Sequence, residues 1–379
     1  MNSPIHTHVF TNRQTQRGLS LVELMISITI GLLILSSLTT LFVNQSRTRA
    51  ELDKSNRMID NGRYALELLS DNLKLAGFYG NYTPSGTPAD TPDPCNLSII
   101  INNTVNNPDP NLYPSTNAQA NLYVLLHHVQ GYNAATATPP STGQIASLPA
   151  TCGFTYTAGS PTTLKDGSDM LVLRRASTAT VAAANATAAP NSANTVYLQV
   201  SNCSTDTSGS YQVAIGSAGF TAFQNKDCVT PASLRPFIVQ VYFVSPDNNV
   251  GDGIPTLKRR ELDAATGAFV TTPLVEGIEY LQIDYGLDTN ADGAADAYCD
   301  FTSTTAPCHL FTAADWPNIV SVKLNIIARN TEPTTGYIDT KTYALGSAGA
   351  FGPFGDAYKR HAYTQVVRLV NPSGRREVP

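Results

Sequence analysis

The sequence predicts an α+β protein in which one long amino-terminal helix spans a membrane and packs on a large antiparallel β-rich head with long loops. Residues 19–43 form a continuous apolar run, residues 44–77 stay rich in helix formers without proline, and runs with strand composition begin only after residue 120. Of 379 residues, 42% are hydrophobic and 14% are charged, which excludes a charge-rich disordered chain and a polytopic membrane protein.

The apolar run at residues 19–43 is long enough to cross a membrane. As a helix it would extend about 37 Å, against a hydrocarbon core of about 30 Å. The preceding residues 1–18 contain Arg13 and Arg17 and no acidic residue, so this flank is expected on the cytoplasmic side. The run lacks the small-residue cleavage site of a conventional secretory signal at its end, so its removal is not expected.

Glu23 is the only ionisable residue in this run. A carboxylate inside an apolar segment costs about 2.5 to 3.5 kcal/mol even on lenient insertion scales, so it should have a partner. Cleavage between Gly18 and Leu19 would create a cationic amino terminus, and the terminus of a neighbouring subunit could then pair with Glu23. The alternative is an ordinary signal anchor with a chance glycine and glutamate at this spacing.

Residues 17–24, RGLSLVEL, resemble the class III signal of type IV pilins and type II secretion pseudopilins. In those families the prepilin peptidase cleaves after the glycine and N-methylates the next residue. The resemblance therefore implies that residues 1–18 are a leader peptide, that Leu19 is methylated after cleavage behind Gly18, and that Glu23 acts in assembly. The families usually have phenylalanine at the position of Leu19. A pilin-like fold is implied as well.

The helix is predicted to continue beyond the apolar run, with residues 44–80 as its periplasmic continuation. One apolar stripe runs along it, formed by Leu52, Ile59, Leu66, Leu69, Leu73 and Ala76. Gly31 and Gly62 are the expected soft points of the helix, and Gly77 and Gly80 are expected to end it. A coiled-coil stalk is the alternative, but the stripe is short and the polar residues do not form the charge pattern of a coiled coil.

Further segments narrow the resemblance to PilW-type minor pilins. NGRYALE and AGFYG, at residues 61–67 and 76–80, resemble the segment that follows the membrane helix in that family. Three later segments resemble the head domain of that family. They are GDGIPTL at residues 251–257, LVEGIEYLQIDYG at residues 274–286, and the run at residues 316–329. Residues 81–230 match no family that we can name.

The resemblance implies a structural subunit and not an enzyme. It implies a minor pilin of a type IV pilus that joins other minor pilins in a priming or tip complex, initiates assembly and supports motility, adhesion or DNA uptake. The implied partners are the prepilin peptidase, the major and other minor pilins, the pilus assembly platform and a tip adhesin. The implied location is the bacterial inner membrane, with the head in the periplasm, and the pilus fibre or tip. The alternatives are a tip-displayed binding module for a surface, an adhesin or DNA, and a type II secretion pseudopilin.

The head is predicted at residues 81–379, as one domain or as subdomains at about 81–230 and 231–379. Residues 81–120 are rich in proline and asparagine and predict an irregular loop region. Strand-like runs follow at residues 121–128, 169–175, 195–201, 236–244, 279–286, 319–328 and 362–370. Apolar and polar residues alternate in 319–328, so one face of this strand is expected to pack on the helix stripe and the other to face water.

All six cysteines lie after the membrane run, on the side where disulfides can form. Many connectivities are possible. Pairing of sequence neighbours is our hypothesis, which joins Cys95 to Cys152, Cys203 to Cys228 and Cys299 to Cys308. Free buried thiols are the alternative.

Residues 288–296, DTNADGAAD, place oxygen-bearing side chains at alternating positions, as in the first part of an EF-hand calcium loop. Cys299 stands where an EF-hand has a bidentate glutamate. A hydrogen-bonded turn rich in Asp, Asn and Gly explains the same residues without a metal. No cofactor is required, and a structural calcium ion remains open, with the candidate ligands Asp288, Asn290, Asp292 and Asp296.

Catalysis and DNA binding are not expected. The sequence contains no phosphate-binding loop and no nucleophile motif, and the adjacent His127 and His128 lack the spacing of helical metal ligands. Basic doublets at residues 174–175, 258–259, 359–360 and 375–376 could form a DNA-binding face. However, 24 basic residues, of which Arg13 and Arg17 leave with the leader, stand against 29 acidic residues.

Overall fold

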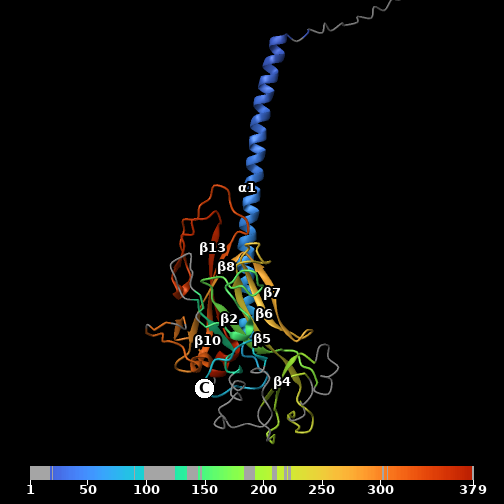
Figure 1. Cartoon of the computed structure of the whole chain (residues 1–379), viewed down its shortest axis with the longest axis vertical. Coiled ribbons are helices and arrows are strands. Elements are labelled where there is room, and N and C mark those ends of the chain that lie inside the picture. The colour runs from blue at the N-terminus through green and yellow to red at the C-terminus, as the bar shows by residue number, and fades with distance from the viewer. Residues whose placement is uncertain are drawn as a thin grey trace, which may run out of the picture. The chain divides into compact units, whose positions relative to one another are not determined.

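The computed structural model describes residues 18, 20–88, 90–97, 124–134, 144–145, 147–182, 193–206, 211–216, 220, 223–300, 303–304 and 306–377. A long helix near the amino terminus and a head of antiparallel strands confirm the predicted α+β, pilin-like class (Figure 1). The chain divides into two compact units, residues 1–53 and residues 54–379.

Helix α1 (Leu21–Leu75) contributes residues to both units. In the second unit it buries the predicted apolar stripe, with Leu66, Leu69 and Leu73 at 7% exposure or less. The prediction was wrong for Leu52, which is 57% exposed. Lys54 of α1 contacts the head, and the first buried residue of the helix is Met58, so the buried stripe starts nearly two helical turns later than Leu52, where the sequence pattern begins.

The larger sheet has seven antiparallel strands in the order β1-β2-β5-β3-β4, with β6 paired to β5 and β7 to β6. Strand β5 is the longest and is rich in β-branched and aromatic residues, which favour the extended conformation. One side of it pairs with β2, and the other pairs first with β3 and then with β6. The strands are β1 (Val129–Tyr132), β2 (Met170–Ala176), β3 (Val196–Val200), β4 (Tyr211–Ile215), β5 (Leu234–Ser245), β6 (Thr256–Asp263) and β7 (Ala268–Glu276).

The second sheet has four antiparallel strands in the order β13-β10-β8-β9. Every residue of β8 is buried, so both faces of this sheet are covered there. The strands are β8 (Ile278–Leu287), β9 (Ala297–Cys299), β10 (Ile319–Arg329) and β13 (Arg360–Arg368). The remaining elements are a pair of two-residue strands, β11 (Tyr343–Ala344) and β12 (Ala350–Phe351), the 3-10 helices η1 (Ala150–Cys152), η3 (Ala313–Asn318) and η4 (Gly346–Ala348), and helix α4 (Val370–Arg376).

The main core joins helix α1 to both sheets. Its members include Leu66 and Leu69 of α1, Leu171 of β2, and Leu324 and Ile326 of β10. This confirms that the apolar face of β10 packs on the helix stripe. Burial of each such side chain contributes about 1.5 to 3 kcal/mol, so the head and the second half of α1 are held together mainly by apolar packing.

A second core covers the opposite face of the larger sheet. Alternate residues of β2 belong to different cores, since Leu171 and Leu173 pack in the first and Val172 packs in the second. Tyr79 and Val124 reach the second core from segments outside the strands. The larger sheet is therefore buried on both faces at β2, as a continuous apolar strand requires.

The prediction that one face of β10 faces water is wrong. Ser321 and Asn325 are 5% and 0% exposed. The Ser321 hydroxyl donates to the Tyr298 hydroxyl at 3.0 Å, and Asn325 Nδ2 donates to the Asp284 carboxylate at 3.2 Å. Strand β9 and helix η4 cover this face, and polar side chains are tolerated there because they are hydrogen-bonded.

The prediction of a strand at residues 121–128 is also wrong. Residues 124–128 form a short turn, the strand begins at Val129, and residues 121–123 lie outside the described part of the chain. The apolar side chains Val124 and Leu125 fill the second core from this turn, so their run marks burial and not strand pairing. Residues 81–88 and 90–97 contain no strand, as expected for the loop region, whereas 98–120 lie outside the described residues.

Candidate functional site

The candidate assembly segment, residues 18–43, includes the start of α1. The Leu24 amide donates to the Ser20 carbonyl at 3.1 Å, which closes the first helical turn. An 18-residue window of this helix has a mean hydropathy of 2.2 and none of it is buried. By length and composition this part of α1 is able to cross a membrane.

Four hydroxyl groups in this segment are satisfied by the helix itself. They donate to backbone carbonyls one turn earlier, from Ser27 to Glu23, Thr29 to Met25, Thr39 to Leu35 and Thr40 to Ser36, at 2.7 to 3.0 Å. Internal hydrogen bonds of this kind let hydroxyls enter an apolar environment. The Glu23 carboxylate, by contrast, accepts no hydrogen bond from the described residues of the first unit.

The predicted processing residues precede the helix. Gly18 is exposed and in no regular structure, and nothing lies within 4 Å of the position a β-carbon would take. Leu19, the predicted new amino terminus, lies outside the described residues. Because α1 begins only at Leu21, the Gly18 carbonyl is not part of the helical hydrogen-bond ladder and is accessible to a peptidase.

Gly62 is not a soft point of α1, as the sequence suggested, but a site of close packing. It is buried, and a β-carbon there would clash with the ring of Tyr363 on β13. The Tyr363 hydroxyl also reaches the Ile59 carbonyl at 3.5 Å. The missing side chain therefore lets β13 approach the helix backbone.

Polar contacts fix the register of α1 on the head. Asn61 Nδ2 donates to the Glu276 carbonyl at 3.0 Å at the end of β7. The Lys54 ammonium lies 3.4 Å from the Glu332 carboxylate. A partly exposed ion pair of this kind contributes about 0 to 1 kcal/mol, so these contacts orient the helix more than they stabilise it.

The end of α1 is held by glycines and by the carboxyl-terminal helix α4. Gly77 and Gly80 have φ of +72° and +67°, as predicted for a helix stop. Asn371 Nδ2 donates to the Ala76 carbonyl at 3.1 Å, and Arg375 Nη1 donates to the Gly77 carbonyl at 3.0 Å. Residues almost 300 positions later therefore satisfy carbonyls that the end of the helix leaves open.

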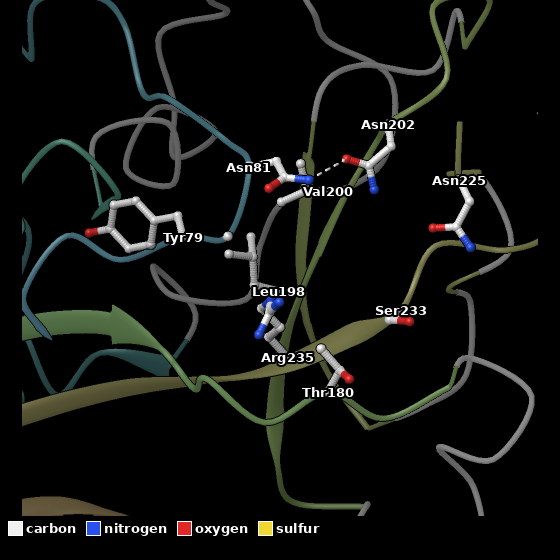
Figure 2. Close-up of a pocket in the computed structure, with 10 residues that line it drawn as sticks. Tyr79, Asn81, Thr180, Leu198, Val200, Asn202, Asn225, Ser233 and Arg235 are labelled. Carbon is white, nitrogen blue, oxygen red and sulfur yellow. Dashed lines mark hydrogen bonds between the residues drawn. The ribbon is translucent and has the colours of Figure 1, made fainter. Parts of the chain in front are cut away.

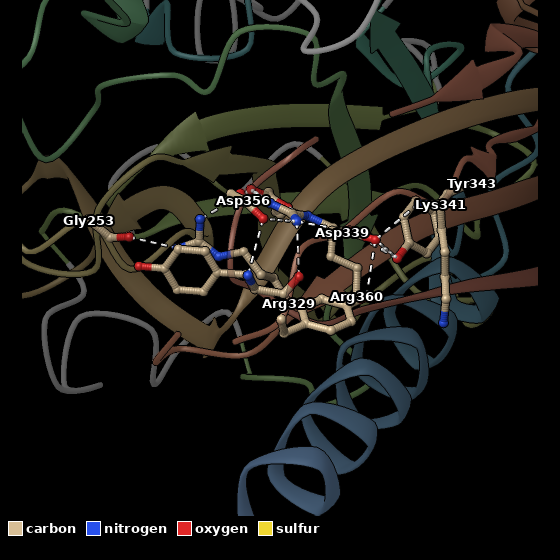
Figure 3. A network of polar contacts seen from close by, with 10 residues as sticks. Gly253, Arg329, Asp339, Lys341, Tyr343, Asp356 and Arg360 are labelled. Carbon is tan, nitrogen blue, oxygen red and sulfur yellow. Dashed lines mark hydrogen bonds and ion pairs between the residues drawn. The ribbon is translucent and has the colours of Figure 1, made fainter. Parts of the chain in front are cut away.

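A buried ion network lies at one end of the second sheet (Figure 3). The Arg360 guanidinium, 1% exposed, pairs with Glu279 at 2.5 Å, Asp339 at 3.0 Å and Asp356 at 2.6 Å, while Arg329 pairs with Glu279 at 3.2 Å. Burial alone would raise the pKa of Asp356, but hydrogen bonds from Arg360 hold it below its usual value. The network ties the long segment between β10 and β13 to the ends of β8, β10 and β13.

The cysteines form three disulfides, Cys95–Cys152, Cys203–Cys228 and Cys299–Cys308, which is the pairing of sequence neighbours, and none of the six is free. Asp93 lies beside the first bridge and accepts hydrogen bonds from the backbone and hydroxyl of Thr151 at 3.0 and 2.7 Å. Because the sulfurs of Cys95 and Cys152 are joined to each other, they are not available as thiolate ligands for a metal.

The carboxylates of the acidic loop, residues 288–296, accept hydrogen bonds from donors within the same loop. The buried Asp288 carboxylate accepts from the amides of Ala291 and Gly293 at 2.7 and 3.0 Å, and its charge is matched by Arg376 at 3.1 Å. Asp296 accepts from the amide and hydroxyl of Thr289 at 2.8 and 2.6 Å, and these bonds lower its pKa. The Asn290 and Asp292 side chains bond to each other at 3.1 Å. This is the arrangement of a hydrogen-bonded turn.

Both adjacent histidines are buried, in the turn before β1 and not on a strand. His128 Nε2 lies 2.8 Å from the Ile319 carbonyl, and burial lowers the pKa of its imidazole to about 4. His128 is therefore a neutral core residue at physiological pH.

In each basic doublet, one of the two cations is bound to groups within the head. The buried Arg174 donates to the carbonyls of His127 and Pro92 and to the Gln130 side chain. The other pairs are Arg259 with Glu261, Arg360 with Glu279 and Arg376 with Asp288.

The comparisons with known proteins agree with this architecture. Residues 241–371 match the family model of the type IV pilus-assembly protein W, and residues 13–39 match the prokaryotic N-terminal methylation motif. Residues 241–371 are thus similar to the head of that family, and residues 13–39 carry the methylation motif. The predicted resemblance to PilW-type minor pilins is thereby confirmed, and the two matches support a pilin associated with type IV pili. No curated protein and no solved structure matches it.

Sequence signals were weak for several residues that organise this head. Tyr363 and Arg360 stand on β13, which was predicted as a strand, but nothing local indicates which partner each side chain meets. Arg360 appeared only as half of a basic doublet, and its partners Glu279 and Asp339 are 81 and 21 positions away. An isolated glycine in a helical pattern, Gly62, was the available signal for the Tyr363 contact.

Proposed function

We propose that this PilW-type protein is a minor pilin that joins other minor pilins in a priming or tip complex and so initiates assembly of a type IV pilus. Before assembly it is anchored in the bacterial inner membrane with the head in the periplasm. The observation that carries the proposal is the assembly segment, an apolar helix surface that is not buried by the rest of the chain and that carries one ionisable residue, Glu23, in its first turn.

Assembly gives the apolar surface of this segment helices to pack on and gives Glu23 a cationic partner. Packing against the helices of other pilins removes its apolar side chains from contact with lipid and favours close van der Waals contact. Cleavage after Gly18 and methylation of Leu19 leave a cationic amine at the new terminus, and the amine of a neighbouring subunit pairs with Glu23. In a surrounding of low dielectric constant this pairing offsets the cost of about 2.5 to 3.5 kcal/mol for an unpaired carboxylate.

The head supports a pilus role over the alternative of a secretion pseudopilin, because the family match runs from the second half of β5 to the start of α4. Its contacts with α1, through Gly62, Asn61 and Asn371, keep the head in one orientation on the helix. A rigid head on an assembling helix suits a subunit that other pilins must recognise by shape. The prepilin peptidase, the other pilins and the assembly platform are the proposed partners.

Replacement of the paired carboxylate tests the proposal. We expect Glu23→Ala to reduce co-purification with other minor pilins at least about tenfold, since an interaction of about 1.4 kcal/mol or more is lost. Glu67→Ala is the matched control, because Glu67 is an exposed glutamate on the part of α1 that packs on the head. Co-assembly of the Glu23→Ala variant at the level of the wild type would contradict the role of Glu23.

A further inference from the structure

A polar pocket of about 200 Å³ opens in the head, away from the assembly segment. Figure 2 shows it between the chain that leaves α1, the end of β3 and the start of β5. Leu198 and Val200 of β3 line its floor. The polar side chains around it are Asn81, Thr180, Asn202, Asn225, Ser233 and Arg235. The pocket is smaller than the pockets that hold drug-sized ligands, and its size suits a ligand of one ring.

The amide groups at the pocket are oriented by hydrogen bonds. Asn81 Nδ2 donates to Asn202 Oδ1 at 3.3 Å, and Asn225 Nδ2 donates to Thr230 Oγ1 at 3.1 Å. Among the described residues nothing bonds to Asn81 Oδ1, Asn225 Oδ1 or Asn202 Nδ2. The pocket therefore offers fixed acceptors and a fixed donor. This combination matches hydroxyl groups, which both donate and accept.

Arg235 supplies the one charge at the pocket. Its guanidinium lies 5.4 Å from the centre of the Phe78 ring, and its Nη1 donates to the carbonyls of Ser177 and Thr178 at 3.1 and 2.7 Å. No carboxylate lines the pocket, and no ion pair joins Arg235 to a described acidic residue. Its planar fork is thus held in place with its positive charge unmatched, which favours a carboxylate on the ligand.

The pocket is held in shape before any ligand arrives. The disulfide Cys203–Cys228 joins the loop after Asn202 to the loop after Asn225. The Asn202 amide donates to the Gln224 carbonyl at 2.9 Å, and the Cys228 amide donates to the Asn225 carbonyl at 2.9 Å. Preorganised polar groups lose less conformational entropy on binding, so a small ligand can be held with few contacts.

From this geometry we propose that the pocket binds an acidic monosaccharide unit, with the sugar carboxylate on Arg235 and the ring hydroxyls on the amides of Asn81, Asn202 and Asn225. This is a binding function separate from pilus assembly. It lies largely in residues 81–235, outside the segment that matches the PilW family.

Titration of the full-length protein in detergent micelles tests the proposal, with galacturonic acid as the probe. We expect a Kd on the order of 1 mM by calorimetry or ligand-observed NMR. Galactose, which lacks the carboxylate, should bind at least about tenfold more weakly, and so should acetate, which lacks the ring. The tripeptide Ala-Ala-Ala separates a sugar carboxylate from a peptide carboxylate and should also bind at least about tenfold more weakly.

Variants assign the binding to this pocket. Arg235→Gln should lose the affinity for galacturonic acid at least about tenfold, and Asn225→Asp should do the same through charge repulsion. Arg63→Gln, which removes an exposed arginine from α1, is the control that should bind as the wild type does. Should Arg235→Gln fail to fold, Asn225→Asp and Asn81→Ala retain the test. Equal binding of acetate, galactose or the tripeptide, unchanged binding by Asn225→Asp, or no binding of galacturonic acid would each overturn the proposal.

Discussion

The ring of Tyr363 lies directly on Gly62, so that a side chain of strand β13 meets the backbone of helix α1. The residues are about 300 positions apart in the sequence. This contact joins the carboxyl-terminal strand of the head to the helix that continues from the assembly segment. It explains why a glycine stands in the middle of a long helix, where it costs about 0.5 to 1 kcal/mol relative to alanine.

Gly62→Ala should destabilise the protein although alanine is the better helix former. The added β-carbon must displace the Tyr363 ring, and overpacking of this kind costs about 1 to 3 kcal/mol. Chemical unfolding monitored by circular dichroism measures the change. Gly374→Ala in α4 is the control, because nothing lies within 4 Å of its β-carbon position, and it should be neutral or stabilising. Equal stability of Gly62→Ala and the wild type would show that the ring moves away without cost.

Arg360→Met should be among the most destabilising substitutions in the head, at about 3 to 5 kcal/mol. It leaves the buried carboxylate of Asp339 without its cation and Glu279 with Arg329 alone, and breaking one partner of a buried ion pair has a cost of this size. Thermal unfolding measures the loss. Arg368→Met on the same strand is the matched control, because its ion pair with Glu377 is about half exposed and contributes about 1 kcal/mol or less. Similar losses from both variants would refute a structural role for the network.

The stability of the protein should fall as the pH is lowered from about 6.5 to about 4, in part because of His128. Burial lowers the pKa of His128 to about 4 in the folded protein. The unfolded chain, with a pKa near 6.5, therefore binds more protons throughout this window, and acid favours unfolding. A single group of this kind contributes a slope of up to about 1.4 kcal/mol per pH unit.

Replacement of the imidazole isolates this effect from the carboxylates that also titrate. Urea unfolding at a series of pH values should give a flatter dependence for His128→Gln than for the wild type. His361→Gln, which removes an exposed histidine from β13, should leave the dependence unchanged. An identical slope in the wild type and in His128→Gln would mean that His128 is not held neutral in the fold.

We propose that the acidic loop at Asp288 is a hydrogen-bonded turn and does not need calcium. Its carboxylates already accept amide hydrogen bonds, and Arg376 neutralises the buried one. About 1 mM calcium chloride should therefore change the melting temperature by less than about 1 °C relative to EDTA, although a weak extracellular site would be filled at this concentration. A rise of several degrees in the wild type that is lost in Asp292→Ala would contradict this and identify a structural metal.

Much of the fold could be predicted from the sequence because its signals are local. The apolar run before Asn44 and the stripe through Leu66 and Leu73 depend on periodicities of a few residues, and so do strongly apolar strands such as β5 and β10. Strands β6 and β7 were not among the predicted strand-like runs. Their residues include Lys258, Arg259 and Thr271. Only the first three residues of β6 are buried and β7 is mostly exposed or half-buried, so no apolar alternation marks either strand.

The candidate site was predictable only where the chemistry lies within one segment. Gly18 and Glu23 were found because a peptidase signal and a charge in an apolar run are adjacent in sequence. The cation of Arg360 and the amides at Asn81, Asn202 and Asn225 come together only through tertiary folding, over separations of up to 144 positions between the three amides. Burial of Ser321 and Asn325 was missed for the same reason, since β9 and η4 cover them from elsewhere in the chain.

Mass spectrometry of the intact protein and of its amino-terminal peptide, from membranes of cells with and without their prepilin peptidase, tests the central claim most directly. The account predicts a chain that starts at Leu19 with one added methyl group when the peptidase is present, and an unprocessed chain when it is absent. Gly18→Glu should give the unprocessed chain in both strains. A protein that starts at Met1 in both strains would contradict assembly through Glu23 and a processed terminus, and would leave a membrane-anchored protein whose head acts on its own.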